Sequence, residues 1–212
     1  SATATTAAGQ GVDLVPGAAT FTSCQASNYQ VSYVNGTLTI TARPITLAAT
    51  GQGTTYGTAL NLGTSAYSVS AGSLASGDAI SAVTLKYNGS ATVPGTVNAG
   101  TYTNGIVASA ATGTGGFNTT NYNIAYSAAD LTVNKATLTV TADNQSRVYG
   151  NANPSLTQTI SGFLNGDTVS VVSGSATAST TATASTGAGS ATITASNTGL
   201  SAANYNFDTL VD

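Results

Sequence analysis

The hydrophobic alternation of residues 35–49 (NGTLTITARPITLAA) changes phase at Arg43-Pro44. Apolar residues before this point lie on even positions and those after it on odd positions, so a regular strand would point them to opposite faces. One sheet with a single buried face should not contain such a change. The residues concerned are Leu38 and Ile40 before the switch and Ile45 and Leu47 after it.

A second phase change occurs at the equivalent place further along the chain, across Asn134-Lys135-Ala136. The residues concerned are Leu131 and Val133 before this switch and Leu138 and Val140 after it. We interpret both switches as junctions, at which the last strand of one module runs almost without interruption into the first strand of the next. A β-bulge within one sheet is the alternative interpretation.

The junction interpretation predicts which residues are buried. The apolar pair before each switch is expected in the core of the preceding module, and the pair after it in the core of the following module. Arg43 and Pro44 are expected to be exposed between them, because proline has no N–H to give to a ladder and a cation is best placed in water. At the second junction the cation is Lys135, which is expected to be exposed in the same way.

Internal repeats support these junctions. An Asn-Tyr pair recurs at 28–29, 121–122 and 204–205, and residues 27–57 align without a gap with residues 120–150. The repeats predict three parts of the chain. These are the C-terminal part of a preceding module at 1–42, a complete module at 43–135, and a second module at 136–212 whose last strand is truncated.

Both modules consist of short β-rich runs bounded by Gly, Asn and Asp turn signals, and no stretch of a dozen residues has a helical period. The expected strands are residues 45–49, 66–69, 80–87, 101–107, 122–126, 138–142, 157–160, 169–172, 191–195 and 205–207. Residues 173–189 are low in complexity and are expected to be an edge strand, a mobile loop or a short helix. The predicted fold is all-β or mostly β, an elongated tandem array of small modules joined by near-continuous strands. The alternative is β-grasp-like modules, each with a short helix.

The amino-acid composition argues against several classes of function. Charged residues make up 5% of the 212 residues, and the four Lys and Arg are scattered, so binding to nucleic acid or to a membrane surface is not expected. No apolar run approaches the roughly 20 residues of a spanning helix, so direct membrane insertion is not expected either. The chain has no His and no Glu, and its seven acidic residues form no paired-carboxylate pattern, so we expect no enzymatic activity, no metal and no cofactor. Cys24 is the only cysteine and is expected to be a small, partly buried hydrophobe, with an intermolecular or reactive thiol as the alternative.

Two aspartates and the tyrosines are the remaining candidates for specific contacts. Asp78 and Asp167 lie in matching turns, where they are expected to form the turn or cap a strand end; calcium binding is the alternative. Tyrosines that recur between modules are expected to fill a core or a junction. Tyr67, Tyr87 and Tyr102 have no counterpart in the next module, and they are the candidates for ligand contact.

The repeats resemble a known type of module. Residues 135–171, which contain Leu-Thr-Val-Thr-Ala-Asp, Val-Tyr-Gly and Gly-Phe-Leu-Asn-Gly-Asp, resemble the YGX-type MBG repeat, and residues 42–85 resemble the related YDG module. The resemblance implies tandem modules of large secreted bacterial adhesins of the filamentous haemagglutinin type, without catalytic residues. It therefore implies an extracellular or cell-surface location.

Two functions are expected from these observations. In the first, the segment is a stalk or spacer that projects an adhesive tip or builds a fibre, with neighbouring modules or other copies as its partners. In the second, the modules themselves bind a host glycan or a matrix polymer. Repetition without a shared polar cluster favours the first function, whereas a groove lined by exposed tyrosines would favour the second.

Overall fold

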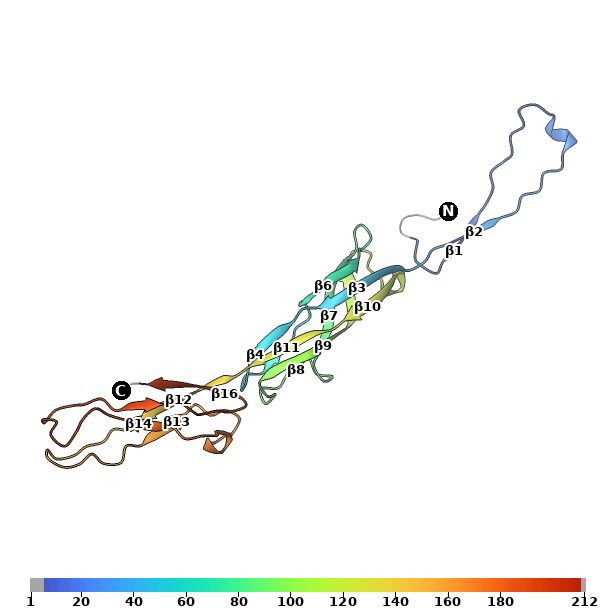
Figure 1. Ribbon diagram of the computed structural model, residues 1–212. Coiled ribbons are helices and arrows are strands. Elements are labelled where there is room, and N and C mark those ends of the chain that lie inside the picture. Colours follow the sequence, from blue (N-terminus) through green and yellow to red (C-terminus); the bar gives the residue numbers. More distant parts are fainter. Residues whose placement is uncertain (1–5, 211–212) are drawn as a thin grey trace. The chain divides into compact units, whose positions relative to one another are not determined.

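The computed structural model describes residues 6–210, which form strands and three short 3-10 helices (Figure 1). The prediction of a mostly-β fold is confirmed. Two compact units are present. Unit 1 contains the described part of 1–50 together with 63–85 and 107–128, and unit 2 contains 51–62, 86–106 and the described part of 129–212. The division differs from the predicted boundaries at 43 and 136, which remain a prediction.

The elements of unit 1 are β1 (Gly11–Leu14), β2 (Gly36–Thr39), β3 (Arg43–Ala49), β6 (Tyr67–Gly72), β7 (Ala79–Lys86) and β10 (Tyr122–Ser127), with 3-10 helices η1 (Ala26–Asn28) and η2 (Thr119–Asn121). Those of unit 2 are β4 (Gln52–Thr55), β5 (Leu60–Asn61), β8 (Thr92–Val93), β11 (Ala129–Asn134), β12 (Ala136–Ala142), β13 (Gln158–Ser161), β14 (Thr177–Ser179), β15 (Thr194–Ser196) and β16 (Tyr205–Leu210), with η3 (Val169–Val171). The long strand β9 (Gly100–Thr114) begins in unit 2 and ends in unit 1, and the last residue of β7, Lys86, lies in unit 2.

Unit 1 contains a three-stranded sheet of order β10-β3-β6. The central strand β3 pairs antiparallel with β6 and parallel with β10, in a register that places Ile45 opposite Ile124. Ile45 and Leu47 are buried, because alternate side chains of β3 point into the core. The burial predicted for the pair after the first switch is confirmed.

Unit 2 repeats this sheet with the order β13-β12-β16. Its central strand β12 again pairs antiparallel with one neighbour and parallel with the strand that comes last in the unit. Leu138 and Val140 are fully buried on β12. Val140 packs in a small core with Ala142, Ala176 and Ala195, of which Ala195 lies on β15 and Ala176 directly precedes β14.

The second phase switch coincides with a change of sheet. Strand β11, with Leu131 and Val133 buried, belongs to the sheet of order β4-β11-β9-β7, whereas β12 belongs to the next sheet. Only Lys135 separates the two strands, and its ammonium donates to the Ala202 carbonyl at 2.8 Å. The phase change is therefore a passage between sheets and not a β-bulge within one sheet.

The first switch also lies between two sheets, since β2 pairs with β1 and β3 belongs to the next sheet. The burial predicted for Leu38 is wrong, because this side chain is 38% exposed, and Ile40 is half-buried. Within the described residues β2 pairs only with β1, and a two-stranded ladder covers little apolar surface. Arg43 and Pro44 are exposed as predicted, although they lie inside β3, and Arg43 donates to the Leu74 carbonyl at 3.2 Å.

Other sequence expectations need correction. Residues 169–171 form the 3-10 helix η3 and not a strand, because the Thr168 side chain caps the turn by accepting from the Ser170 amide. The low-complexity stretch 173–189 contributes only the short strand β14. The short helix of the alternative β-grasp-like fold is present in the described residues only as three-residue 3-10 turns. Strand β4 was not predicted, because Gln52–Thr55 contains no apolar residue.

Candidate interface between repeats

A tight turn in unit 2 places an aspartate at a sheet end. Asn165 and Gly166 both have positive φ, of 54° and 81°, and the Asp167 amide donates to the Leu164 carbonyl at 2.9 Å. Positive φ at both central residues defines a type I′ turn, for which Asn-Gly is the preferred pair. The turn formation predicted for Asp167 is therefore observed, and its side chain is left free to accept hydrogen bonds.

Tyr205, the first residue of β16, forms hydrogen bonds with this turn. The Tyr205 hydroxyl donates to Asp167 Oδ2 at 2.7 Å and accepts from the Leu164 amide at 2.9 Å. The side chain is only 2% exposed. Burial raises the pKa of Tyr205, and the adjacent Asp167 carboxylate adds to this shift. The phenol is thus held in its neutral, donating form.

A second tyrosine, from the repeat that precedes this turn, completes the cluster. Tyr56 follows β4, and its hydroxyl donates to the same Asp167 Oδ2 at 2.9 Å. Its ring meets that of Tyr205 edge to face, with centroids 5.4 Å apart. Tyr56 is 5% exposed, so the carboxylate accepts two hydroxyls from two largely buried rings.

Further polar contacts surround this tyrosine–aspartate cluster of unit 2. The Asn204 side chain accepts from the Ala99 amide at 2.9 Å and donates to Asn98 Oδ1 at 3.0 Å. The Asn165 side chain donates to the Gly95 carbonyl at 3.1 Å. Residues 95–99, which precede β9, thus contact two segments of the following repeat, namely the turn and the Asn-Tyr pair.

Close packing accompanies these hydrogen bonds at Gly57. A Cβ atom added to this residue would lie 2.3 Å from Leu164 Cδ1, so only glycine fits at this distance. Its φ of 90° also favours glycine. In the recurring Tyr-Gly pair at 56–57, the tyrosine therefore bonds to Asp167 of the turn, and the glycine lets the backbone lie close to Leu164.

Unit 1 contains a counterpart of the cluster. The Tyr122 hydroxyl donates to Asp78 Oδ2 and accepts from the Ala75 amide, the latter at 2.9 Å. Burial raises the pKa of Tyr122, with the hydrogen bond to Asp78 as the next cause. The Ala8 amide donates to the Asn121 side chain at 2.9 Å, as the Ala99 amide does to Asn204 in unit 2.

The three tyrosines predicted as ligand contacts are engaged within their own units. The Tyr67 hydroxyl donates to the Ile80 carbonyl at 2.9 Å in unit 1. In unit 2, Tyr87 and Tyr102 meet edge to face with centroids 5.8 Å apart, and the Tyr102 hydroxyl donates to the Asn98 carbonyl at 2.8 Å. Burial raises the pKa of Tyr102, and the neighbouring Tyr87 adds to it. Ligand binding by these residues remains a prediction.

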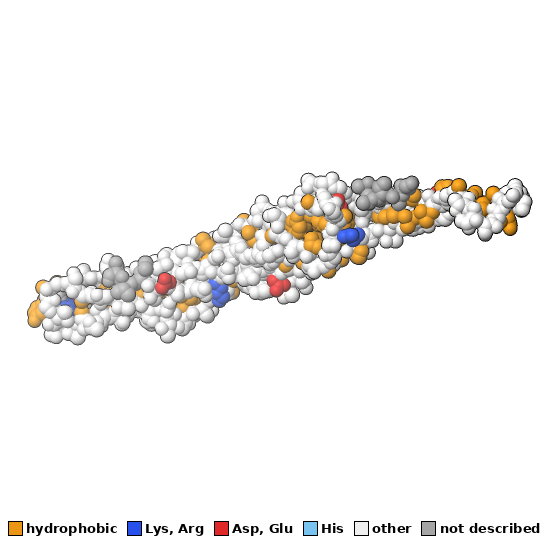
Figure 2. All heavy atoms as spheres, turned by 90° about the horizontal axis from the view of Figure 1, so that it is seen from above, with side chains coloured by type: hydrophobic (Ala, Val, Ile, Leu, Met, Phe, Trp, Pro, Cys, Tyr) orange, Lys and Arg blue, Asp and Glu red, His pale blue; other side chains and the backbone are white. Residues whose placement is uncertain are grey.

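The surface offers few charged groups. Figure 2 shows isolated Lys, Arg and Asp side chains on a face formed mostly of uncharged polar groups and backbone. Residues 6–210 contain no group of three or more His, Cys, Asp or Glu side chains that could hold a metal ion. No helix in this described part is long and apolar enough to cross a membrane. Cys24 is exposed, so the expectation of partial burial is wrong.

The clusters show what sequence reasoning missed. The sequence reveals that Tyr122 and Tyr205 recur and that Asp78 and Asp167 lie in matching turns, but the expectations above do not pair them. The shared order of the motifs is the signal that points to it, since a Gly-Asp turn at 77–78 precedes Asn121-Tyr122 and another at 166–167 precedes Asn204-Tyr205. In unit 2 the hydroxyls of two largely buried tyrosines donate to one carboxylate oxygen of Asp167, so the cluster is a structural contact between segments of the chain.

The fold and the cluster define a β-rich protein built from repeats, in which residues at recurring positions contact the following repeat. The comparison with protein families agrees with this class. Residues 138–212 match the family described as MBG domain (YGX type), as the sequence predicted. This family is one of repeat modules of surface or adhesin-type proteins and is not a known enzyme family. No curated protein and no solved structure matches the chain.

Proposed function

We propose that this chain is a non-enzymatic, load-bearing spacer of an extracellular bacterial adhesin or surface fibre. It stands outside the cell, and its partners are neighbouring repeats of the same kind. Support comes from the family match at 138–212 and from the repeated contact between Tyr56, Asp167 and Tyr205. These residues serve contacts between segments of the chain, so the spacer function is favoured over glycan binding.

One observation carries this proposal, namely that the first and last strands of each three-stranded sheet are parallel neighbours. Strand β3 pairs with β10, and β12 pairs with β16, each over six register positions. Tension along the chain pulls the start of the first strand and the end of the last strand in opposite directions. Because the two strands are parallel, this tension loads all hydrogen bonds of the ladder in shear at the same time.

The geometry of pulling tests the proposal in the full chain. Two double-cysteine variants, both carrying Cys24→Ser, share an anchor at Asp208→Cys near the end of β16. In the first variant the other anchor is Lys135→Cys, directly before β12, so that pulling shears the β12–β16 ladder. In the second variant it is Asp143→Cys, directly after β12, so that pulling opens the ladder one bond after another.

We expect a higher unfolding force in the shear geometry, measured by single-molecule force spectroscopy. Urea unfolding of the two variants serves as the control, because equal stability assigns the difference in force to the direction of pulling. Equal forces in the two geometries would contradict a load-bearing role. Binding of an antibody to the chain on intact cells tests the surface location separately.

A further inference from the structure

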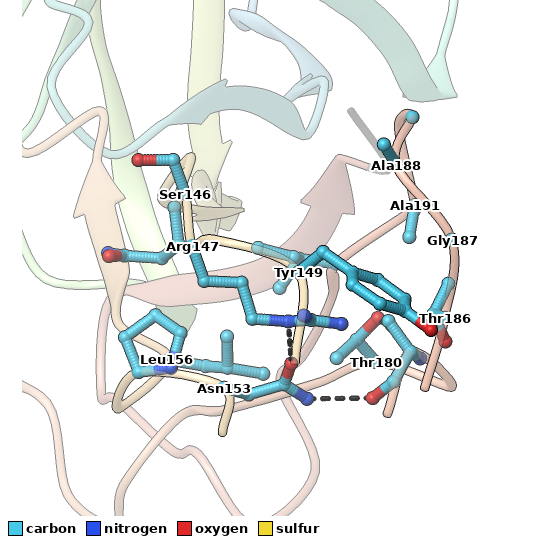
Figure 3. A pocket seen from close by; sticks show the side chains of 15 residues that line it. Ser146, Arg147, Tyr149, Asn153, Leu156, Thr180, Thr186, Gly187, Ala188 and Ala191 are labelled. Atoms are coloured by element: carbon cyan, nitrogen blue, oxygen red, sulfur yellow. Dashed lines mark hydrogen bonds between the residues drawn. The ribbon is translucent and has the colours of Figure 1, made fainter. Parts of the chain in front are cut away.

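An open groove of unit 2, shown in Figure 3, is bridged by the chain's own residues. The Arg147 side chain donates to Asn153 Oδ1 at 2.9 Å, and Asn153 donates to the Ala182 carbonyl at 2.7 Å. The Gly150 amide also donates to the Ala184 carbonyl, at 3.3 Å. The groove is therefore held together by contacts of its own repeat. Backbone groups suited to binding a partner lie instead at sheet edges, where a strand has a neighbour on one side only.

Strand β10 is such an edge, and the repeat that contains it, 43–135, lies wholly within the described residues. In the sheet of order β10-β3-β6 it pairs with β3 alone, over the six residues Tyr122–Ser127. This register is regular, whereas that of β6, at the other edge of the sheet, shifts between Thr46 and Leu47. The second side of β10 therefore has no strand partner among the described residues.

The sheet of unit 2 indicates which backbone groups of β10 face outward. Strands β3 and β10 have the same register as β12 and β16. The Ala136 amide donates to the Asn204 carbonyl at 2.9 Å, so Asn204 faces β12. Because backbone groups alternate in direction along a strand, Phe207 faces away from it. The position equivalent to Phe207 is Ile124, so the amides and carbonyls of Ile124 and Tyr126 face outward from β10.

The equivalent edge of unit 2 is protected, and that of β10 is not. On β16 the Phe207 carbonyl accepts from the Asn197 side chain at 3.0 Å, and the next residue is the charged Asp208. The residue of β10 that corresponds to Asp208 is Ala125, and the strand YNIAYS contains no charged residue and no proline. Charged residues, proline and bulges are the features by which proteins prevent edge-to-edge pairing. An edge without them is open to a further strand.

The side chains of β10 are suited to a second copy of the same strand. When two copies pair antiparallel with Ala125 opposite Ala125, Tyr126 of each lies opposite Ile124 of the other. Tyr126 is 38% exposed and Ile124 is half-buried, so each covers apolar surface that the other leaves open. Pairs of an aromatic and a β-branched residue stabilise neighbouring strands. The uncharged Ala125 lets the two strands approach at the symmetry axis.

We propose that β10 is a docking edge for β10 of a second copy of this chain, so that the two three-stranded sheets form one sheet of six strands. The low charge of the chain, −3 over 212 residues, leaves little repulsion between copies. One six-residue ladder is smaller than the interface of a stable dimer, so the contact is weak and depends on concentration. The partner is a like chain, and the inference goes beyond the spacer function without depending on it.

A charge placed at the symmetry axis provides the direct test. All variants of the full chain carry Cys24→Ser, because Cys24 is exposed and could form a disulfide between copies. Ala125→Asp places two carboxylates opposite each other and should weaken dimerisation at least about tenfold, measured by sedimentation equilibrium. Aspartate is compatible with the fold here, since Asp208 occupies the equivalent position of β16. The matched control Ser68→Asp adds the same charge at an exposed position of β6 and should leave dimerisation unchanged.

Mixing variants of opposite charge separates a specific contact from misfolding. Ala125→Lys should also fail to pair with itself. A mixture of Ala125→Asp and Ala125→Lys places opposite charges at the axis, and it should form heterodimers at least as tightly as the parent chain forms dimers. Energy transfer between two fluorescent labels, one on each variant, measures this pairing. A mixture of Ala125→Asp with Ser68→Lys should not pair, because its charges do not meet.

Hydrogen exchange locates the contact. On raising the concentration of the parent chain, exchange of the outward amides of Ile124 and Tyr126 should slow, whereas that of Asn123 and Ala125, which face β3, should change little. Three results would overturn the docking edge: a monomer at about 1 mM, equal dimerisation of Ala125→Asp and Ser68→Asp, and slower exchange only outside β10. The force measurement on β12–β16 uses single molecules, so failure of this test leaves the spacer proposal standing.

Discussion

The two tyrosine–aspartate clusters have the same internal design, but they differ in what reaches them from the preceding repeat. In unit 2, Asp167 accepts the hydroxyls of both Tyr205 and Tyr56. In unit 1, Asp78 accepts one tyrosine hydroxyl among the described residues, that of Tyr122. The bond from the terminal tyrosine to the turn therefore forms within one repeat, and the second tyrosine adds a contact between repeats.

The same comparison holds for the position that supplies the second tyrosine. Tyr56-Gly57 packs against the turn at Leu164, whereas the equivalent Tyr149-Gly150 is exposed. Within the described residues, the two copies of one sequence motif therefore differ in exposure because the turn at Leu164 covers only the first of them. This pairing supplies matched controls for measuring what docking contributes to stability.

The largest expected effect is the difference between Tyr56→Ala and Tyr149→Ala. Tyr56→Ala removes a buried ring that packs on Tyr205, and it should lower the free energy of unfolding by about 3–5 kcal/mol. Tyr149→Ala removes an exposed ring and should change it by less than about 0.5 kcal/mol. Urea unfolding followed by circular dichroism measures both. Similar losses in the two variants would show that Tyr56 stabilises its own repeat and not the contact.

The next effect concerns the two aspartates. Asp167→Asn weakens a charge-assisted acceptor of two hydroxyls and should cost about 1.5–3 kcal/mol of unfolding free energy. Asp78→Asn affects one tyrosine hydroxyl and should cost about 1 kcal/mol. A double-mutant cycle with Tyr56→Phe should show coupling to Asp167 and none to Asp78. Equal costs for the two aspartates would mean that the second hydroxyl contributes nothing.

Substitutions of the two glycines by alanine measure the packing of Gly57 against Leu164. Gly57→Ala and Gly150→Ala should both lower the free energy of unfolding by about 1–2 kcal/mol, because each places an alanine in the left-handed region. The two costs should be similar, since the two φ values nearly coincide. Gly57→Ala should cost about 1–3 kcal/mol more, since its new Cβ meets Leu164. The difference between their urea midpoints measures the packing at the contact. No difference would indicate that Leu164 moves away freely.

The smallest expected effect is the loss of stability in alkali. Burial raises the pKa of Tyr205 and of Tyr122 above the ordinary value of about 10. Stability from these phenols is therefore complete below about pH 10 and is lost as the pH rises through the raised folded-state pKa. Tyr205→Phe and Tyr122→Phe should each reduce the fall in urea midpoint above pH 10. An unchanged fall in both variants would mean that other groups cause it.

Much of the local structure could be predicted from the sequence. Alternation of apolar residues predicted β3 and β12, and the phase switches at Arg43-Pro44 and Lys135 predicted that the chain passes between sheets. These features depend on the period of two in a strand, which is a local property. Repetition of Asn-Tyr and Tyr-Gly likewise marked positions with a shared structural role, and the family match covers the second repeat.

Only the tertiary structure decided which of these positions are docked. Tyr56 and Tyr149 are the same residue in the same motif, and their exposure differs because a following turn covers one of them and not the other. Strand β4 was missed because Gln52–Thr55 has no hydrophobic pattern and is a strand through its ladder with β11. Such burial and pairing depend on segments far apart in the chain, so no local pattern contains them.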